Sequence, residues 1–399
     1  MIPFLIDWSE LLIRWLHIIA GIAWIGSSFY FVHLDLSLKQ RPGLPDKAFG
    51  DAWQVHGGGF YHMVKYLIAP AQMPDELTWF KWEAYATWLS GMALLVVVYY
   101  LGAELYLIDT HVLALSASQA ILISLAGIVA GWVIYDGLCR SPAGNDDRTL
   151  LGVGFVFLIA AAYVFTRLFS PRGAFMEIGA LIGTMMVANV LMVIIPGQRK
   201  VVKALLAGET PDPIYGKRGK QRSLHNNYLT LPVVFVMIGN HYAFVFATRW
   251  SWAILALIVI VGVLLRHFYN SRHKGLPSPW WTWGASAICI IVAIWLSAQG
   301  PSYGPRVESP TAGPKVLAAD AYNVVALRCA MCHANEPGWP GVRRAPRGVV
   351  METPEQIEAL APRIAAVAVW SNAMPPGNIT EIEDGERATL AAWLKDKGL

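Results

Sequence analysis

The chain has 399 residues, of which 55% are hydrophobic and 15% are charged, whereas an ordinary soluble domain has roughly 25% charged residues. This composition excludes a single soluble globular domain. The net charge of +4 comes from 31 basic and 27 acidic residues, and the basic ones gather between long apolar runs, a pattern typical of membrane topology and not of nucleic-acid binding.

Eight apolar stretches in the first three quarters of the chain are long enough for the roughly 20 residues that cross a bilayer as a helix. No basic segment precedes the first stretch and no small-residue cleavage site follows it, so we expect a retained membrane helix and no signal peptide. The predicted fold is all-α, an eight-helix integral membrane bundle in contact with lipid. The stretches are centred in residues 11–32, 84–103, 112–135, 149–166, 173–195, 228–248, 250–266 and 279–298.

The basic residues between these stretches predict the orientation of the bundle, because Lys and Arg accumulate in cytoplasmic loops. The loops after the second, fourth and sixth stretches hold only Arg167, Arg172 and Arg249. Both termini are therefore expected to face the periplasm, across a bacterial inner membrane. The other loops hold Lys39, Arg41, Lys47, Lys65, Lys81, Arg140, Arg148, Arg199, Lys200, Lys203, Lys217, Arg218, Lys220, Arg222, Arg272 and Lys274.

The apolar character stops near Ser302, where Gly, Pro and Ser become frequent. We therefore divide the chain into a membrane domain at 1–298, a linker at 299–316 and a small soluble domain at 317–399. Within the last domain, residues 321–328 and 383–397 have the periodicity of amphipathic helices.

The soluble domain contains a covalent haem attachment motif, C-x-x-C-H, formed by Cys329, Cys332 and His333. Two thiols at this spacing form thioether bonds to the haem vinyl groups, and the next residue supplies an imidazole to the iron. A zinc site would need further thiol or imidazole ligands, and none follows His333. The motif predicts haem c, which is attached outside the cytoplasm and thus agrees with the orientation from the loop charges.

A sixth iron ligand is expected from a later loop, and Met374 is the best candidate. Prolines follow it directly and stiffen the loop that would present its thioether. The alternative is that Met374 only fills space in the core, which is the ordinary role of methionine. Helix, attachment motif, methionine loop and C-terminal helix together predict a small class I cytochrome c domain.

Histidines inside the apolar stretches fall at two depths. His17 and His33 are 16 residues apart in the first stretch, as are His225 and His241 around the sixth, and 16 residues of helix span about 24 Å, close to the hydrocarbon thickness. His17 and His241 therefore lie on the outer side, where they would sandwich a haem b, with Arg14 available for its propionates. Alternatively, these histidines hydrogen-bond to neighbouring helices and Arg14 snorkels to the interface.

The inner layer is richer in polar groups and is the predicted substrate site. Three consecutive glycines after His56 permit close backbone approach to a ligand, and imidazole and amide groups suit a planar polar heterocycle. A metal site, a second haem, solvated histidines and a glycine hinge are the alternatives. The candidate catalytic residues in this layer are His33, His56, His62, His225 and Asn226.

Four segments resemble the bacterial membrane-bound urate oxidase family, whose members carry a fused C-terminal cytochrome c. They are residues 16–26 (LHIIAGIAWIG), 53–61 (WQVHGGGFY), 79–83 (WFKWE) and 225–232 (HNNYLTLP). The resemblance implies oxidation of urate to 5-hydroxyisourate in purine catabolism. It also implies that the electrons pass to the protein's own haem c, then to another cytochrome c or a terminal oxidase of the respiratory chain, and not directly to oxygen.

Two other functions fit the same sequence features. The histidine layers could carry electrons from a quinol to cytochrome c. A solute transporter or channel with a regulatory cytochrome domain has the same division into a membrane part and a soluble part.

Overall fold

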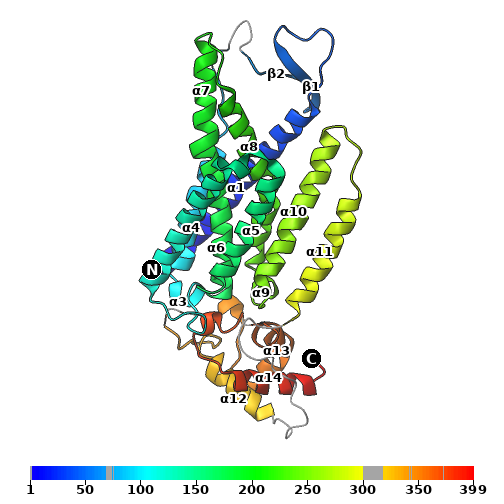
Figure 1. Ribbon diagram of the computed structural model, residues 1–399. Coiled ribbons are helices and arrows are strands. Elements are labelled where there is room, and N and C mark those ends of the chain that lie inside the picture. The colour runs from blue at the N-terminus through cyan, green and yellow to red at the C-terminus, as the bar shows by residue number, and fades with distance from the viewer. Residues whose placement is uncertain are drawn as a thin grey trace.

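The computed structural model describes residues 2–68, 74, 76–299, 318–340, 342, 344–371 and 373–399, with the backbone alone for residues 2–4. Most of these residues are helical, in a long bundle followed by a small helical unit at one of its ends (Figure 1). The prediction of a mostly helical protein with several apolar helices is confirmed. Apart from Gln299, the predicted linker at 299–316 lies outside the described residues.

Each predicted apolar stretch overlaps with a helix of the bundle. In the described part, five spans are long and apolar enough to cross a membrane, namely Leu5–Ser37, Ala117–Arg140, Asp147–Phe165, Pro171–Leu206 and Ser251–His273, and Trp281–Ser297 is a shorter apolar helix. Eight membrane crossings therefore stay a prediction. The elements are α1 (Ile2–Ser37), α2 (Trp82–Leu94), η1 (Leu95–Tyr100), α3 (Ala103–Tyr106), α4 (Ala117–Arg140), η2 (Pro142–Asn145), α5 (Asp147–Phe165), α6 (Pro171–Ala188), η3 (Asn189–Ile194), α7 (Ile195–Leu206), α8 (Pro213–Gly239), α9 (Ala243–Phe246), α10 (Ser251–His273) and α11 (Trp281–Ser297).

Polar side chains fix where the helices of the bundle begin. Ser116 caps α4 by accepting a hydrogen bond from the backbone N–H of Gln119, whose side chain in turn accepts from the Ser116 N–H. Asp146 caps α5, and Ser170 caps α6 with a proline directly after it. These caps satisfy N–H groups that have no partner inside the helix.

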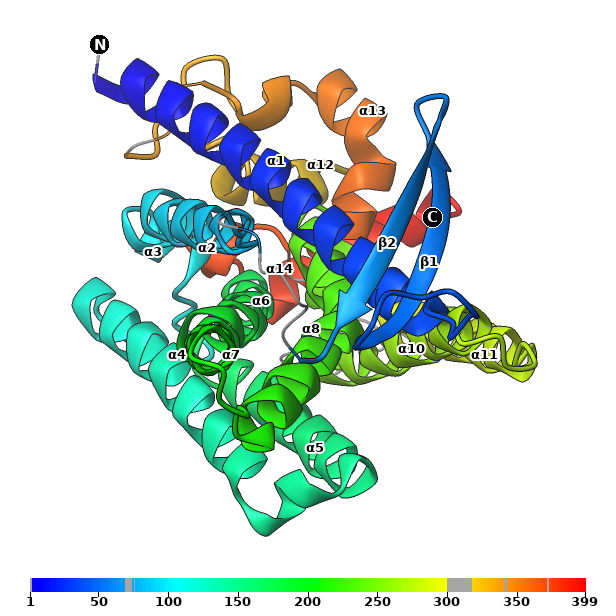
Figure 2. The same ribbon diagram turned by 90° about the horizontal axis from the view of Figure 1, so that it is seen from above.

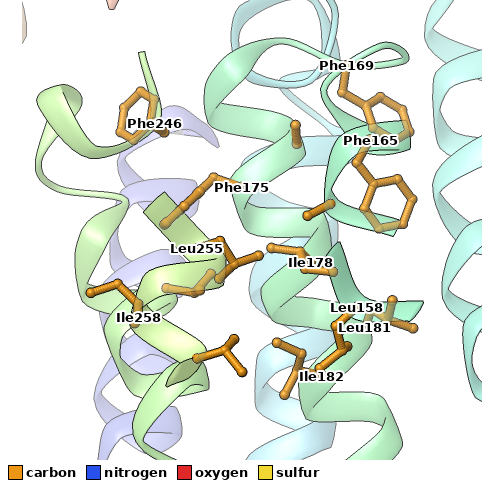
Figure 3. Packing of buried hydrophobic residues seen from close by; sticks show 14 of the residues in the cluster. Leu158, Phe165, Phe169, Phe175, Ile178, Leu181, Ile182, Phe246, Leu255 and Ile258 are labelled. Carbon is orange, nitrogen blue, oxygen red and sulfur yellow. The ribbon is translucent and has the colours of Figure 1, made fainter. Parts of the chain in front are cut away.

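Helix α6 forms the centre of the bundle. Its residues Ile178, Leu181 and Ile182 are almost completely buried, and they pack against apolar side chains of α5 and α10, such as Leu158 and Leu255 (Figure 3). Apolar side chains also point outwards: Ile22 on α1 is 66% exposed and Leu122 on α4 is 68% exposed. The bundle is therefore apolar both at its centre and on its surface.

Glycines allow the helices to approach each other closely. A Cβ atom on Gly131 of α4 would lie 2.1 Å from a methyl carbon of Leu181, and one on Gly262 of α10 would lie 2.6 Å from the ring of Pro232. Small residues at helix contacts are common in membrane bundles. Figure 2 shows α1 running obliquely across the bundle, with α10 and α11 next to each other on one side.

The basic segment after the fifth apolar stretch is helical and not the loop that the sequence suggested. The helix that starts as α6 continues through the π-helical segment η3 into α7. After a short turn, α8 begins at Pro213 with Asp212 as its cap, so residues 217–222 lie in its first turns. Both helices extend away from the C-terminal unit (Figure 1).

The segment with three glycines forms a β-hairpin, which the sequence analysis did not predict. Strands β1 (Ala48–His56) and β2 (Gly59–Tyr66) pair antiparallel, with Trp53 opposite His62. Gly57 and Gly58 form the turn with φ values of +60° and +78°. Two consecutive positive φ values are typical of the tight turns that join hairpin strands, and they favour glycine.

The C-terminal unit has its own apolar core. It contains α12 (Ala318–Arg328), η4 (Pro346–Gly348), α13 (Pro354–Ile364), η5 (Ala365–Val369), η6 (Pro376–Asn378) and α14 (Asp384–Asp396). Helix α12 packs on α14, and Val325 and Leu390 at this crossing are fully buried.

The C-terminal unit contacts the bundle through the loop that follows Met374. The backbone of Gly377 lies against α3 and the residues after it, since a Cβ atom there would be 2.4 Å from the carbonyl oxygen of Ile108. Asn378 donates a hydrogen bond from Nδ2 to Nε2 of His111 over 2.6 Å. The unit thus lies at the end of the bundle opposite the hairpin and α7 (Figure 1).

Candidate functional site

The attachment motif begins where α12 ends. The backbone N–H of His333 donates to the carbonyl of Cys329 over 2.9 Å, so the motif forms one turn that holds both thiols. Nδ1 of His333 lies 2.9 Å from the carbonyl oxygen of Val349. Because a carbonyl only accepts, Nδ1 carries the proton and Nε2 keeps its lone pair for a metal. These groups fit a covalently bound haem c with His333 as axial ligand.

The Met374 loop is held beside the attachment motif by Arg387 of α14. The Arg387 guanidinium donates to the carbonyl oxygens of Ala368 and Met374, the latter over 3.2 Å. Burial raises the pKa of Cys329 to about 11, and the charge of Arg387 acts against this increase. Arg387 therefore lies close to both segments, and the thioether of Met374 could supply a sixth ligand.

His17 faces α2, and the structure does not bring it into contact with His241. Nδ1 of His17 lies 2.9 Å from the carbonyl oxygen of Thr87 and 3.1 Å from Oγ of Ser90, which leaves Nε2 as a possible metal ligand. The ring fits because residue 91 is glycine, where a Cβ would lie 2.9 Å from it. His241 is exposed in the turn after α8, and Arg14 forms an ion pair with Glu10.

The predicted inner layer separates into two groups. The first group joins the end of α1 to the hairpin through an ion pair of 2.6 Å between Lys65 and Asp35. His33 packs edge-on against His273 of α10, with ring centroids 4.4 Å apart. His273 was missed by the sequence analysis, since nothing in its local sequence indicates that it meets His33. His56 lies next to the hairpin turn and is exposed.

Asp51 of β1 binds His62 of β2 and also Arg41, which precedes the hairpin. Its two carboxylate oxygens accept hydrogen bonds of 2.8 Å from His62 Nε2 and from Arg41, and the His62 ring stacks on Trp53 at 4.2 Å. Burial alone would raise the pKa of Asp51, but these hydrogen bonds and charges outweigh burial and hold its pKa below the ordinary value. His62 is thus fixed in position by structural contacts.

The second group is a buried hydrogen-bonded network around His225 and Asn226 of α8. Tyr135 of α4 forms a hydrogen bond of 2.7 Å with Nδ1 of His225. Asn189, the first residue of η3, donates to the Tyr135 hydroxyl over 3.0 Å and to Oδ1 of Asn226 over 2.9 Å. Asn226 donates in turn to the carbonyl oxygen of Met186. Every polar side-chain atom of Asn189 and Asn226 therefore has a partner, since Oδ1 of Asn189 accepts a hydrogen bond from Arg222.

Arg222 of α8 also belongs to this network. It donates to Oδ1 of Asn189 over 3.0 Å and to Asp136 over 2.6 Å, although it is only 3% exposed. Cys139 lies close by, with Sγ 3.9 Å from Nδ1 of His225. Tyr135 and Arg222 were missed as site residues because their partners are distant in sequence. A π-helical segment such as η3 frequently marks a functional site, and this one contributes Asn189.

The network places an imidazole, a phenol and a thiol within hydrogen-bond distance of one another, and these are groups that can donate and accept protons. The described residues contain no group of three or more His, Cys, Asp or Glu side chains placed to hold a metal ion.

Comparison with known proteins identifies the larger part of the chain. No curated protein matches it, and no solved structure matches it. One family model does match, over residues 3–297, and its description is urate oxidase N-terminal. The match covers the bundle, the hairpin and the buried network, and we conclude that the chain belongs to the urate oxidase N-terminal family.

Proposed function

We propose that the chain is a membrane-bound enzyme that oxidises urate to 5-hydroxyisourate and passes the electrons to haem c in its own C-terminal unit. The observation that carries this proposal is the family match at 3–297 followed, in the same chain, by the C-x-x-C-H motif at the end of α12. Urate and water give 5-hydroxyisourate, two protons and two electrons. Haem c supplies a one-electron acceptor, so the two electrons leave in succession.

The C-terminal residues have distinct roles in this proposal. Cys329 and Cys332 would bind the haem covalently, and Nε2 of His333 and the thioether of Met374 would coordinate its iron. Arg387 holds the Met374 loop through its carbonyl oxygen. A haem b at His17 and His241 is also proposed, and the hydrogen bond of His17 through Nδ1 supports Nε2 as the ligand atom.

The proposed location is the bacterial inner membrane, with both termini and the C-terminal unit in the periplasm. The exposed apolar side chains of α1 and α4 and the five long apolar helices support lipid contact. The basic residues of α7 and α8 lie at the end opposite the C-terminal unit, in agreement with a cytoplasmic position. A reporter fused after Leu399 should be active in the periplasm, and one inserted at Gly208 only in the cytoplasm.

The experiment that tests the function is anaerobic addition of urate to the purified, oxidised, haem-loaded protein. We expect the alpha band of reduced haem c to develop without oxygen, and hydrogen peroxide not to accumulate in amounts equal to urate during aerobic turnover. Pyridine haemochrome spectra of the same sample give the amounts of haem c and haem b. A haem that stays oxidised with saturating urate and is reduced by a quinol would contradict the proposal and favour a quinol-to-cytochrome conduit.

A further inference from the structure

A basic cleft of about 140 Å³ opens between α4, η3, α7 and α8. Since one water molecule needs roughly 10–15 Å³ on this measure, the cleft holds on the order of ten waters, or one small ligand. Cys139 forms part of its wall and connects it to His225 of the buried network. The cleft is lined by Cys139, Arg140, Met192, Val193, Pro196, Gly197, Lys200, Tyr215, Arg218, Gln221 and Arg222.

The charges around the cleft favour an anion. Four of the lining side chains are cationic, and Asp136 is the carboxylate that forms ion pairs with two of them, Arg140 and Arg222, each over 2.6 Å. Lys200 lies above the ring of Tyr215, with Nζ 4.8 Å from the ring centroid. Arg218 precedes Arg222 by one turn of α8. The cleft therefore has more positive charges than this one carboxylate neutralises, and a negatively charged ligand would balance the remaining charge.

The preference of basic residues for the cytoplasmic side of a membrane does not by itself explain why these cations surround a cleft. Basic residues that set topology need only lie on the cytoplasmic side, whereas Arg222 is buried within the bundle. Its hydrogen bonds to Asn189 and Asp136 hold the guanidinium in one position. A positively charged group fixed at the base of a cleft is the arrangement expected of an anion-binding site.

The uncharged part of the lining suits a flat ring. Tyr215, whose ring lies beside Lys200, contributes an aromatic ring to the lining, and Met192 and Pro196 offer apolar contacts. Gly197 has no side chain, and a Cβ there would lie 3.6 Å from Cβ of Tyr215, so α7 and α8 lie close together at this point. Aromatic and apolar walls with a few fixed polar groups are typical of sites for small heterocycles.

We propose that this cleft binds the substrate as a planar purine monoanion, with Lys200, Arg218 and Arg222 recognising its negative charge. The inference rests on the proposed function and names the place where urate binds. It differs from the sequence-based expectation, because none of the five predicted catalytic residues lines the cleft, and His225 and Asn226 lie only in the neighbouring buried network. Urate would enter from the end opposite the C-terminal unit, and Cys139 in the wall of the cleft would separate it from His225 of the buried network.

The test is equilibrium binding of radiolabelled urate to the purified, haem-loaded, full-length protein in detergent. The variant is Lys200→Gln with Arg218→Gln, two side chains that are exposed to solvent, so their replacement leaves the buried network intact. The matched control is Arg199→Gln with Lys217→Gln, which removes the same charge from neighbouring exposed positions outside the cleft. We expect the cleft variant to bind urate at least tenfold more weakly and the control to remain within twofold of the unaltered protein.

Anaerobic reduction of haem c by urate is measured on the same samples, so that a failure of the proposed binding site can be distinguished from a failure of the proposed function. If the unaltered protein binds urate and its haem is reduced, but both double variants bind urate equally, the cleft is not the site and the proposed function stands. If the unaltered protein neither binds urate nor is reduced by it, the proposed function fails. Loss of a co-purified anionic phospholipid from the cleft variant, with unchanged urate affinity, would assign the cleft to a lipid headgroup and overturn the inference.

Discussion

Single residues join helices that are distant in the sequence, and Tyr135 illustrates this. Its hydroxyl accepts from Asn189 and is paired with Nδ1 of His225, so one oxygen connects α4, η3 and α8. Spacing along the sequence predicted a depth for His225 but not the direction in which its ring points. A partner 90 residues away leaves no local signal, because the contact depends on how the helices pack.

Tyr135→Phe should destabilise the bundle by about 1–3 kcal/mol, since it leaves buried partners of the hydroxyl without a hydrogen bond. The matched control is Tyr163→Phe, whose hydroxyl is on the surface of α5 and accepts from Arg167. That change should stay within about 0.5 kcal/mol of the original protein. Thermal unfolding in detergent compares the two variants, and equal midpoints would show that the Tyr135 hydroxyl adds no stability.

At the scale of elements, the sequence predicted helices better than it predicted the polar segments between them. Long apolar stretches require helices in a bilayer, and a helix overlaps with each predicted stretch. The hairpin was missed because the three glycines after His56 were interpreted as a place where the backbone approaches a ligand, or as a hinge. Two glycines between strand-like segments also indicate a tight turn. The basic residues of α7 and α8 were assigned to a loop because charge, and not periodicity, was the property considered.

The stability of the hairpin should depend on the charge of Asp51. Its pKa is lowered in the folded state, so the unfolded segment takes up a proton at a higher pH than the folded one, and acid favours unfolding. The stabilisation of the hairpin by the Asp51 carboxylate is complete above about pH 4, the ordinary pKa of aspartate. It is lost as the pH falls through the lower pKa that Asp51 has in the folded state.

Hydrogen exchange of residues 48–66, corrected for intrinsic rates, measures this effect. Protection should fall between neutral pH and about pH 3, and Asp51→Asn should lower protection at neutral pH and remove the dependence on acid. Asp46→Asn, at an exposed position before β1, is the control and should behave like the original protein. Protection that does not change with pH in the original protein would show that the contacts with Arg41 and His62 do not stabilise the hairpin.

In the whole molecule, the two proposed sites lie at opposite ends. The basic cleft is formed by α4, η3, α7 and α8 at one end, and the C-terminal unit contacts α3 and the residues after it at the other (Figure 1). Near this contact, burial raises the pKa of Asp109, against smaller opposing effects of the His111 backbone N–H and of the charges of His111 and Arg387. The Met374 loop, which Arg387 holds through a carbonyl oxygen, therefore leads directly into the contact with the bundle at Gly377 and Asn378.

Gly377→Ala should separate the C-terminal unit from the bundle without removing its haem. Gly377 has a φ of +57°, and the added Cβ would lie 2.4 Å from the carbonyl oxygen of Ile108, so the loop must move away from α3. We expect faster hydrogen exchange in residues 104–111 and at least a tenfold slower reduction of haem c by urate, with the absorbance spectrum of haem c retained. Gly385→Ala is the matched control, because a Cβ there meets no atom within 4 Å. Unchanged exchange and unchanged reduction in the Gly377 variant would mean that electrons reach the C-terminal unit by a route that does not need this contact.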